Sequence, residues 1–166
     1  MMVIISGVII LLLVCILANI VNLVEAKHRK TISSCCFEDN IIDVKLPIIP
    51  VKIGNKRLNF LVDSGSEQNH INKNDLKNVK HTMLDKCIEV YGMEGNRTVV
   101  PYCALNLAYT KDCKFNDVEF LVTDLSGAFD NMKKDHNIKV HGIIGSQFLR
   151  DMGFVIDYAE STIYLK

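Results

Sequence analysis

The sequence lacks tryptophan and has no excess of either charge. It contains 166 residues, with 19 Lys and Arg against 19 Asp and Glu, and only 7% of its residues are aromatic. Nucleic-acid-binding proteins usually carry a basic surface, and those that bind single strands add aromatic platforms for base stacking. Neither feature is present, so we expect no nucleic-acid partner. The length is typical of a single domain.

The cysteines and histidines lack the spacing of a metal site. Tetrahedral zinc sites usually draw on pairs such as Cys-x2-Cys and His-x3-His. No such pair occurs, although His28, Cys35 and Cys36 are close in sequence. Of the six cysteines, Cys15 lies in a long apolar run, and the remaining five show no regular spacing, which indicates reduced thiols. We expect no metal and no cofactor.

Charged side chains are absent from residues 3–24, an apolar run interrupted only by Ser6, Gly7, Asn19 and Asn22. About 20 such residues cross a bilayer as a helix. We therefore predict a transmembrane anchor over residues 1–26, with residues 3–24 in contact with lipid. A signal peptide cleaved after Ala26 is the alternative. The run is longer than a usual signal-peptide core and no Lys or Arg precedes it, which favours the anchor.

Basic residues follow this run, at Lys27, Arg29 and Lys30. The positive-inside rule then places the rest of the chain on the cytoplasmic side of a single-pass membrane protein. Residues 27–42 have mixed charge and no periodicity, so we predict a juxtamembrane linker. The folded domain is assigned to residues 43–166.

Within that domain, short β-branched segments separated by turns predict an all-β fold. Pro47 and Pro50 restrict the first strand to a sheet edge or a bulged course. Asn72 or Asn74 is expected to cap a helix start. Residues 125–139 contain Ser-Gly, Asp-Asn and a charged tract, and we predict a surface loop there. The expected strands cover residues 41–53, 57–62, 87–91, 98–109, 118–123, 154–158 and 161–165.

One of these predicted strands ends at an aspartate that lies in a tight turn. Phe60, Leu61 and Val62 favour a buried strand, and Asp63-Ser64-Gly65 ends it, because glycine adopts backbone angles closed to other residues. A carboxylate at the end of a buried strand is costly unless it accepts hydrogen bonds or shares a proton. This placement points to a functional carboxylate. The alternative is an ordinary aspartate that caps its own turn.

The segment Asp63-Ser64-Gly65-Ser66 resembles the catalytic D-[ST]-G-[AS] signature of the retropepsin-like aspartic proteases. A second element, Gly142-Ile143-Ile144-Gly145, is similar to the hydrophobic-hydrophobic-glycine element of that family. It is followed by Ser146-Gln147-Phe148-Leu149, where the family has a short helix. The resemblance covers residues 43–166. It implies a closed, all-β retropepsin-like protomer with one short C-terminal helix.

The resemblance also implies a role for each matching residue. Asp63 is the implied catalytic carboxylate, and Ser64 carries the hydroxyl that cross-links the two active-site loops. Gly65 and Ser66 support the carboxylates, and Gly145 is the structural glycine that lets the chain pass close behind the loop. A glycine-rich turn lies where the family has the flap that closes over substrate, an ordinary hairpin turn being the alternative; its residues are Gly92, Met93, Glu94 and Gly95.

A second Asp-Ser-Gly or Asp-Thr-Gly triplet is missing. Aspartic proteolysis uses two carboxylates that share one proton, and a two-fold homodimer would bring Asp63 from each protomer to one site. The resemblance therefore implies a membrane-anchored, homodimeric aspartic endopeptidase acting on peptides or proteins. The main alternative is an inactive peptide-binding or scaffold module on the same fold. An unrelated β domain with a chance triplet would leave the element at Gly142–Gly145 unexplained.

Overall fold

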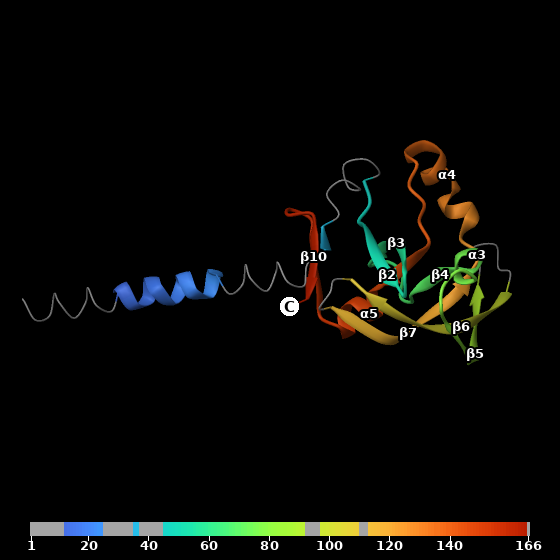
Figure 1. Ribbon diagram of the computed structural model, residues 1–166, viewed down its shortest axis with the longest axis horizontal. Coiled ribbons are helices and arrows are strands. Elements are labelled where there is room, and N and C mark those ends of the chain that lie inside the picture. The colour runs from blue at the N-terminus through green and yellow to red at the C-terminus, as the bar shows by residue number, and fades with distance from the viewer. Residues whose placement is uncertain (1–11, 25–34, 37–44, 92–96, 110–112, 166) are drawn as a thin grey trace, which may run out of the picture. The chain divides into compact units, whose positions relative to one another are not determined.

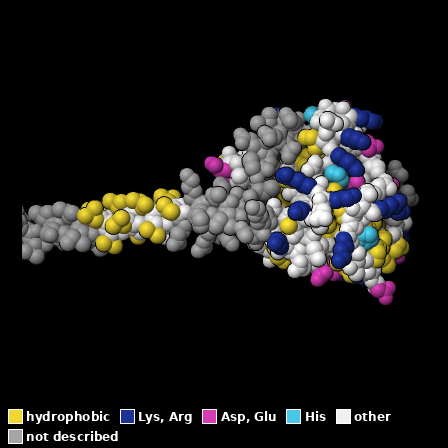
Figure 2. All heavy atoms as spheres, in the orientation of Figure 1, with side chains coloured by type: hydrophobic (Ala, Val, Ile, Leu, Met, Phe, Trp, Pro, Cys, Tyr) yellow, Lys and Arg dark blue, Asp and Glu magenta, His cyan; other side chains and the backbone are white. Residues whose placement is uncertain are grey.

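The computed structural model describes residues 12–24, 35–36, 45–91, 97–109 and 113–165. The chain divides into two compact units, Met1–Ile32 and Ser33–Lys166. In the first unit, residues 12–24 are helical and their apolar side chains are exposed around the helix (Figure 2). Within the described ranges, no helix has both the length and the apolar character needed to span a membrane. Residues 3–11 of the predicted anchor lie outside these ranges.

The second unit is built on a seven-stranded mixed sheet with the order β2-β3-β8-β4-β7-β6-β5 (Figure 1). Strand β2 also pairs with β6, through Lys52 and Ala108, so that the sheet curls back on itself. This mainly β architecture confirms the predicted fold class. The strands are β2 (Ile48–Ile53), β3 (Lys56–Asp63), β4 (His70–Asn72), β5 (Thr82–Tyr91), β6 (Arg97–Ala108), β7 (Lys114–Thr123) and β8 (Gly142–Gly145).

Alternation along β3 separates the core from the opposite face of the sheet. Phe60 and Val62 are almost fully buried in the main core, where the rings of Phe60 and Phe120 lie 5.8 Å apart. Leu61 points to the other face and belongs to a second, smaller cluster. Burial of one such aromatic or aliphatic side chain contributes about 1.5 to 3 kcal/mol, so this alternation holds the strand in one register.

A small antiparallel sheet forms from both ends of the second unit, in the order β1-β10-β9. Strands β9 (Phe154–Asp157) and β10 (Thr162–Leu165) form a hairpin, which confirms the predicted closing hairpin. Strand β1 (Cys35–Cys36) pairs with β10 and lies within the segment predicted as a linker. Two residues are too few to show a period-2 pattern, so the sequence carries no signal for this strand.

Two short helices follow the predicted positions. Helix α5 (Ser146–Asp151) begins directly after Gly145. Helix α3 (Lys73–Leu76) is capped by Asn72, whose side-chain oxygen accepts a hydrogen bond from the Asn74 N–H at 3.3 Å. An asparagine is favoured at this position because it satisfies a backbone donor that the helix leaves unpaired.

The prediction of a surface loop at residues 125–139 is wrong. Helix α4 (Ser126–His136) occupies most of this segment (Figure 1). Leu125 and Phe129, one helical turn apart, are buried in the second cluster, with Met132 partly buried beside them. Polar residues dominate the segment, so the sequence shows only a weak helical pattern of apolar residues. The buried residues that share this cluster with α4 are Ile48 and Val140.

Both ends of α4 are stabilised by hydrogen bonds. Before the helix, the Asp124 carboxylate accepts a bond from the Ser126 N–H at 3.1 Å, and this bond lowers the pKa of Asp124. After it, Asn137 adopts a left-handed φ of 55° and donates its N–H to the Lys133 carbonyl at 3.1 Å. Asparagine tolerates this conformation better than most residues, so the helix has a defined stop.

Candidate active site

Asp63 is the last residue of β3, where it pairs with Gly145 of the parallel strand β8. Its carboxylate is half-buried and accepts a hydrogen bond from the Gly65 N–H at 2.8 Å. The Asp63 carbonyl accepts a second bond, from the Ser66 N–H at 3.3 Å. The turn therefore supplies one hydrogen-bond donor to the carboxylate, which partly offsets the cost of placing it at the end of a buried strand. Ser64, which lies between Asp63 and Gly65 in the sequence, is exposed.

Gly65 is not required for a left-handed backbone, contrary to the prediction. Positive φ angles occur at Gly54 and Gly153 among the glycines of the described segments, and Gly65 is not one of them. A Cβ at Gly65 would instead lie 3.2 Å from Asp63 Oδ1, closer than ordinary van der Waals contact. Glycine at this position gives the carboxylate room to approach the backbone N–H.

The turn is tied to the start of α5 by four hydrogen bonds, one of which joins the side chains of Gln68 and Gln147 at 3.2 Å. The Ser66 carbonyl accepts bonds from the Ser146 N–H at 2.7 Å and from its hydroxyl at 2.9 Å. The Gln147 N–H donates to the Glu67 carbonyl at 3.2 Å. Within the turn, the Ser66 hydroxyl donates to the Gln68 carbonyl at 2.8 Å. The loop that carries Asp63 is thus held by a segment 80 positions away in sequence.

Gly145 lies against the same loop. A Cβ at this position would be 2.6 Å from the Gln68 carbonyl carbon and 2.9 Å from the Glu67 carbonyl oxygen, and closer still to the Gln68 oxygen. All of these are backbone atoms, which cannot move aside as a flexible side chain does. Gly145 is therefore the point where β8 passes directly behind the loop.

Asn69 also supports the loop, and the sequence analysis missed it. Its side chain is buried, accepts a hydrogen bond from the Gly145 N–H at 2.9 Å and donates one to the Glu119 carbonyl at 3.0 Å. Its own carbonyl accepts from the Leu121 N–H at 2.9 Å. One side chain thus links the loop, β8 and β7. The only available signal was an amide residue a few positions after the motif.

We expect Asn69→Ala to lower the free energy of unfolding by about 1 to 3 kcal/mol, because the buried Gly145 N–H then has no acceptor. Urea denaturation of the two proteins measures the difference. The exposed Asn78→Ala serves as control, with an expected change within about 0.5 kcal/mol. Equal losses in both variants would show that Asn69 does not anchor the loop.

The face of the sheet that carries Asp63 also carries His70. Paired residues on neighbouring strands point to the same face; Leu61 pairs with Ile143, and Ile143 pairs with His70. The His70 Nδ1 lies 3.0 Å from the Thr123 hydroxyl. Burial lowers the pKa of His70, and the negative charge of Asp63 opposes that shift. Near neutral pH His70 is therefore a neutral group on the Asp63 face.

Helix α4 covers part of this same face. Its residues Leu125 and Phe129 pack in the second cluster together with Leu61 and Ile143. Leu61 precedes Asp63 by two positions on β3, so α4 packs on the face of the sheet that carries Asp63. This contact was not predicted, because a loop was expected at residues 125–139.

The predicted flap residues Gly92, Met93, Glu94 and Gly95 lie outside the described residues. Strands β5 and β6 pair in antiparallel register up to Tyr91 and Arg97, so they lead directly into that turn. Ile88 and Val90 of β5 remain more than a third exposed. The described part of the hairpin thus presents an apolar surface to solvent.

In the part of the chain that the structure describes, no group of three or more His, Cys, Asp or Glu side chains is arranged to hold a metal ion. Cys15, Cys87 and Cys103 are free thiols. Burial raises the pKa of the Cys103 thiol to about 11, so this group stays protonated and unreactive at neutral pH.

Comparison with solved structures finds proteins with low sequence identity. The retroviral protease-like domain of Ddi1 from Leishmania major is 14% identical, covering 73% of this chain and 88% of that chain with a TM-score of 0.49. A retropepsin-like aspartic protease from Rickettsia conorii is 17% identical, covering 71% and 78% with a TM-score of 0.43. The EIAV protease complexed with the inhibitor HBY-793 is 19% identical, covering 66% and 90% with a TM-score of 0.46. No curated protein sequence matches the chain.

A family model described as aspartyl protease matches residues 49–148. This range contains the turn at Asp63 and the strand that ends at Gly145 behind it, together with the hairpin of β5 and β6. The match spans more than half of the chain, and it includes both ends of the hydrogen-bonded loop. The chain therefore belongs to the aspartyl protease family.

Proposed function

We propose that this protein is an aspartic endopeptidase whose active site forms when two copies bring their Asp63 carboxylates together. The observation that carries the proposal is Asp63 itself. It is half-exposed at the end of a strand, it lies in a loop fixed by Gly145 and Asn69, and it belongs to the one Asp-Ser-Gly triplet of an aspartyl protease family member. A single carboxylate cannot act as base and acid together, so a second copy must supply the partner.

The two carboxylates divide the chemistry by sharing one proton. Like charges about 3 Å apart do not both ionise, so one carboxylate stays protonated at mildly acidic pH. The ionised carboxylate takes a proton from water, which attacks the carbonyl carbon of the peptide. The protonated carboxylate donates its proton to the carbonyl oxygen, which gives a tetrahedral diol. The carboxylate that took the water proton then passes it to the amide nitrogen, the C–N bond breaks to release the amine, and a diol hydroxyl returns a proton to the other carboxylate. The Gly65 N–H, already bonded to Asp63 Oδ1, keeps each carboxylate in place, and the exposed Ser64 hydroxyl is free to cross-link the two loops.

The substrate binds as an extended strand between the sheet and the β5–β6 hairpin. Backbone hydrogen bonds hold such a peptide and alternate side chains enter pockets. The exposed apolar residues Ile88 and Val90 support this mode, because they offer contact area to apolar substrate side chains. Gly92, Met93, Glu94 and Gly95, which lie between β5 and β6 in the sequence, act as the flap.

Residues 3–24 anchor the protein in a membrane, with the protease domain on the cytoplasmic side. Support comes from the apolar run and from the basic residues after it. Confinement to a bilayer raises the effective concentration of the two protomers. A dimer that is weak in solution then forms in the membrane even when the protein is expressed at a modest level.

The proposal is tested with the full chain reconstituted into phosphatidylcholine vesicles and given a diverse peptide pool from mildly acidic to neutral pH. Mass spectrometry should find cleavage at defined sites, with a bell-shaped dependence on pH. The activity per protein should rise with the protein-to-lipid ratio, because only dimers are active. Absence of cleavage while chemical cross-linking shows dimers would contradict the proposal and favour the inactive binding module.

A further inference from the structure

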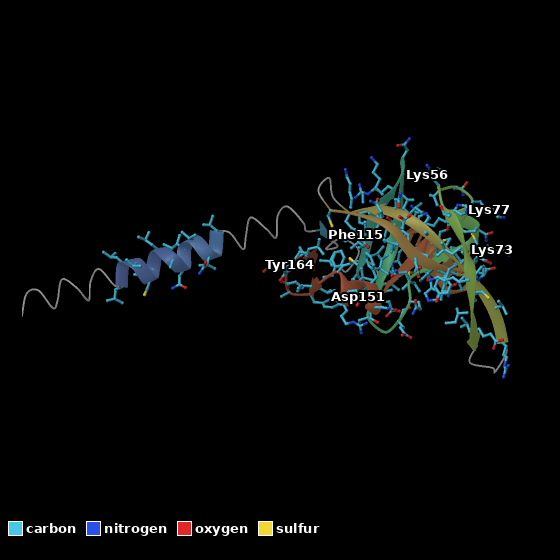
Figure 3. The ribbon with its side chains drawn as sticks, turned by 90° about the horizontal axis from the view of Figure 1, so that it is seen from below. Lys56, Lys73, Lys77, Phe115, Asp151 and Tyr164 are labelled. Atoms are coloured by element: carbon cyan, nitrogen blue, oxygen red, sulfur yellow. The ribbon has the colours of Figure 1, made fainter. Side chains whose placement is uncertain are left out.

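A basic groove lies at the end of β3 opposite to Asp63. It has a volume of about 790 Å³ and is formed by the β2–β3 turn, the end of β6 and the start of β7. Its four cationic residues are Lys52, Lys56, Arg57 and Lys114, with asparagine amides between them. Lys56 lies at the outer end of its hairpin in Figure 3. Lys56 and Asp63 are the two ends of β3, about 23 Å apart along an extended strand, so the groove is separate from the candidate active site.

Among the residues that the structure describes, no acidic side chain lines the groove, and its four cations are exposed. Across the described residues, none of these four forms an ion pair, whereas Lys86, Lys139 and Arg150 do. A concave surface lined by one sign of charge concentrates counter-ions. The chain as a whole has no net charge, so this concentration of cations is a local property that selects an anionic partner.

The proposed membrane anchor determines which anionic partner lies close to the groove. The second unit begins at Ser33, and the apolar run ends at Val24. A connection of this length spans at most about 30 Å, so the domain stays close to the bilayer. Cytoplasmic leaflets carry anionic phospholipids that attract Lys and Arg near the surface. We propose that the basic groove binds anionic phospholipid headgroups and docks the domain on the membrane, an inference that rests on the membrane anchor of the proposed function.

Docking should depend steeply on charge. Each Lys or Arg side chain near an anionic membrane raises the binding constant about fivefold. Substitution of Lys52 and Arg57 by glutamine should therefore lower the ratio of docked to undocked domain about 25-fold. High salt should release the domain as well, because the Debye length shortens. Both side chains are exposed, so the double variant is expected to fold normally.

Because the chain contains no tryptophan, the fluorescence of a single introduced tryptophan reports only on the surroundings of that residue. Asn55→Trp places a single tryptophan in the β2–β3 turn beside the groove. The matched control is Asn131→Trp, at an exposed position on α4. Each full-length variant is reconstituted into vesicles that carry a nitroxide-labelled headgroup, which quenches tryptophan on close approach. One set of vesicles is phosphatidylcholine alone and the other includes phosphatidylglycerol.

The expected result is stronger quenching of Asn55→Trp in the anionic vesicles, reversed by high salt and by the Lys52→Gln and Arg57→Gln pair, with little change for Asn131→Trp. Equal quenching in both lipids, or an equal response of the control, overturns the proposal. A response of Asn55→Trp to polyglutamate but not to anionic lipid also overturns it and assigns the groove to an acidic protein.

Two further measurements test the proposals on which the groove depends. Flotation with phosphatidylcholine vesicles at high salt tests the membrane anchor, and peptide cleavage tests the protease activity. Failure of either proposal is therefore distinguished from failure of the groove to bind lipid.

Discussion

Replacement of Asp63 by asparagine is expected to lower the rate of peptide cleavage by about 100- to 10,000-fold, the range that acid–base catalysis contributes. Asparagine keeps an oxygen that accepts the Gly65 N–H, so the fold of the turn is preserved. It cannot ionise or share a proton, so both roles of the carboxylate are lost. Cleavage of one identified peptide by full-length protein in vesicles, at matched dimer content, measures the effect.

The matched control is Asp130→Asn, at an exposed position on α4, which should keep the activity of the unmodified protein. Subunit mixing tests the shared site more sharply. When equal amounts of active protein and Asp63→Asn exchange freely, about one quarter of the dimers keep both carboxylates. The activity per active chain should therefore fall to about half. Undiminished activity of the mixture would show that each protomer works alone.

Replacement of Gly145 by alanine is expected to lower the free energy of unfolding by about 1 to 3 kcal/mol or more, the usual cost of overpacking. The new methyl group would lie 2.6 Å from the Gln68 carbonyl carbon and 2.9 Å from the Glu67 oxygen. Relief of these contacts requires movement of the loop backbone, and that loop carries Asp63. Urea denaturation measures the loss of stability. Cleavage should fall as well under conditions in which the variant remains folded.

Gly127→Ala is the matched control for this substitution. Gly127 lies in the first turn of α4, and a Cβ there would meet nothing within 4 Å. Alanine favours a helix over glycine, so we expect a gain of up to about 1 kcal/mol. The two glycine-to-alanine changes should therefore have opposite signs. A loss at Gly145 no larger than the change at Gly127 would mean that the loop is not packed against β8.

Local patterns were sufficient for several elements. Phe60, Leu61 and Val62 form a strand that ends at Asp63, and Asn72 caps a short helix as predicted. The β9–β10 hairpin is likewise visible in the sequence, because two apolar segments are separated by a short polar turn. In each case neighbours in sequence determine the structure, so a short window contains the information.

Features that depend on distant partners were not predictable. Helix α4 is stabilised by Leu125 and Phe129 against Ile48 and Val140, a contact that no local window contains. The role of Asn69 depends on the Gly145 N–H and the Glu119 carbonyl, which only the folded sheet brings within reach. At Gly65 the expected left-handed backbone is absent, and the close approach of this glycine to Asp63 depends on the geometry of the folded turn.

The tie between Ser66 and Ser146 has a consequence for biosynthesis. Their hydrogen bonds join positions 80 residues apart, and translation proceeds at about 5 to 20 residues per second. The loop that carries Asp63 therefore leaves the ribosome several seconds before the segment that holds it. A nascent chain that has not reached Ser146 lacks these bonds. The loop that carries Asp63 therefore reaches its final hydrogen-bonded form only after Ser146 has been synthesised and has left the ribosome.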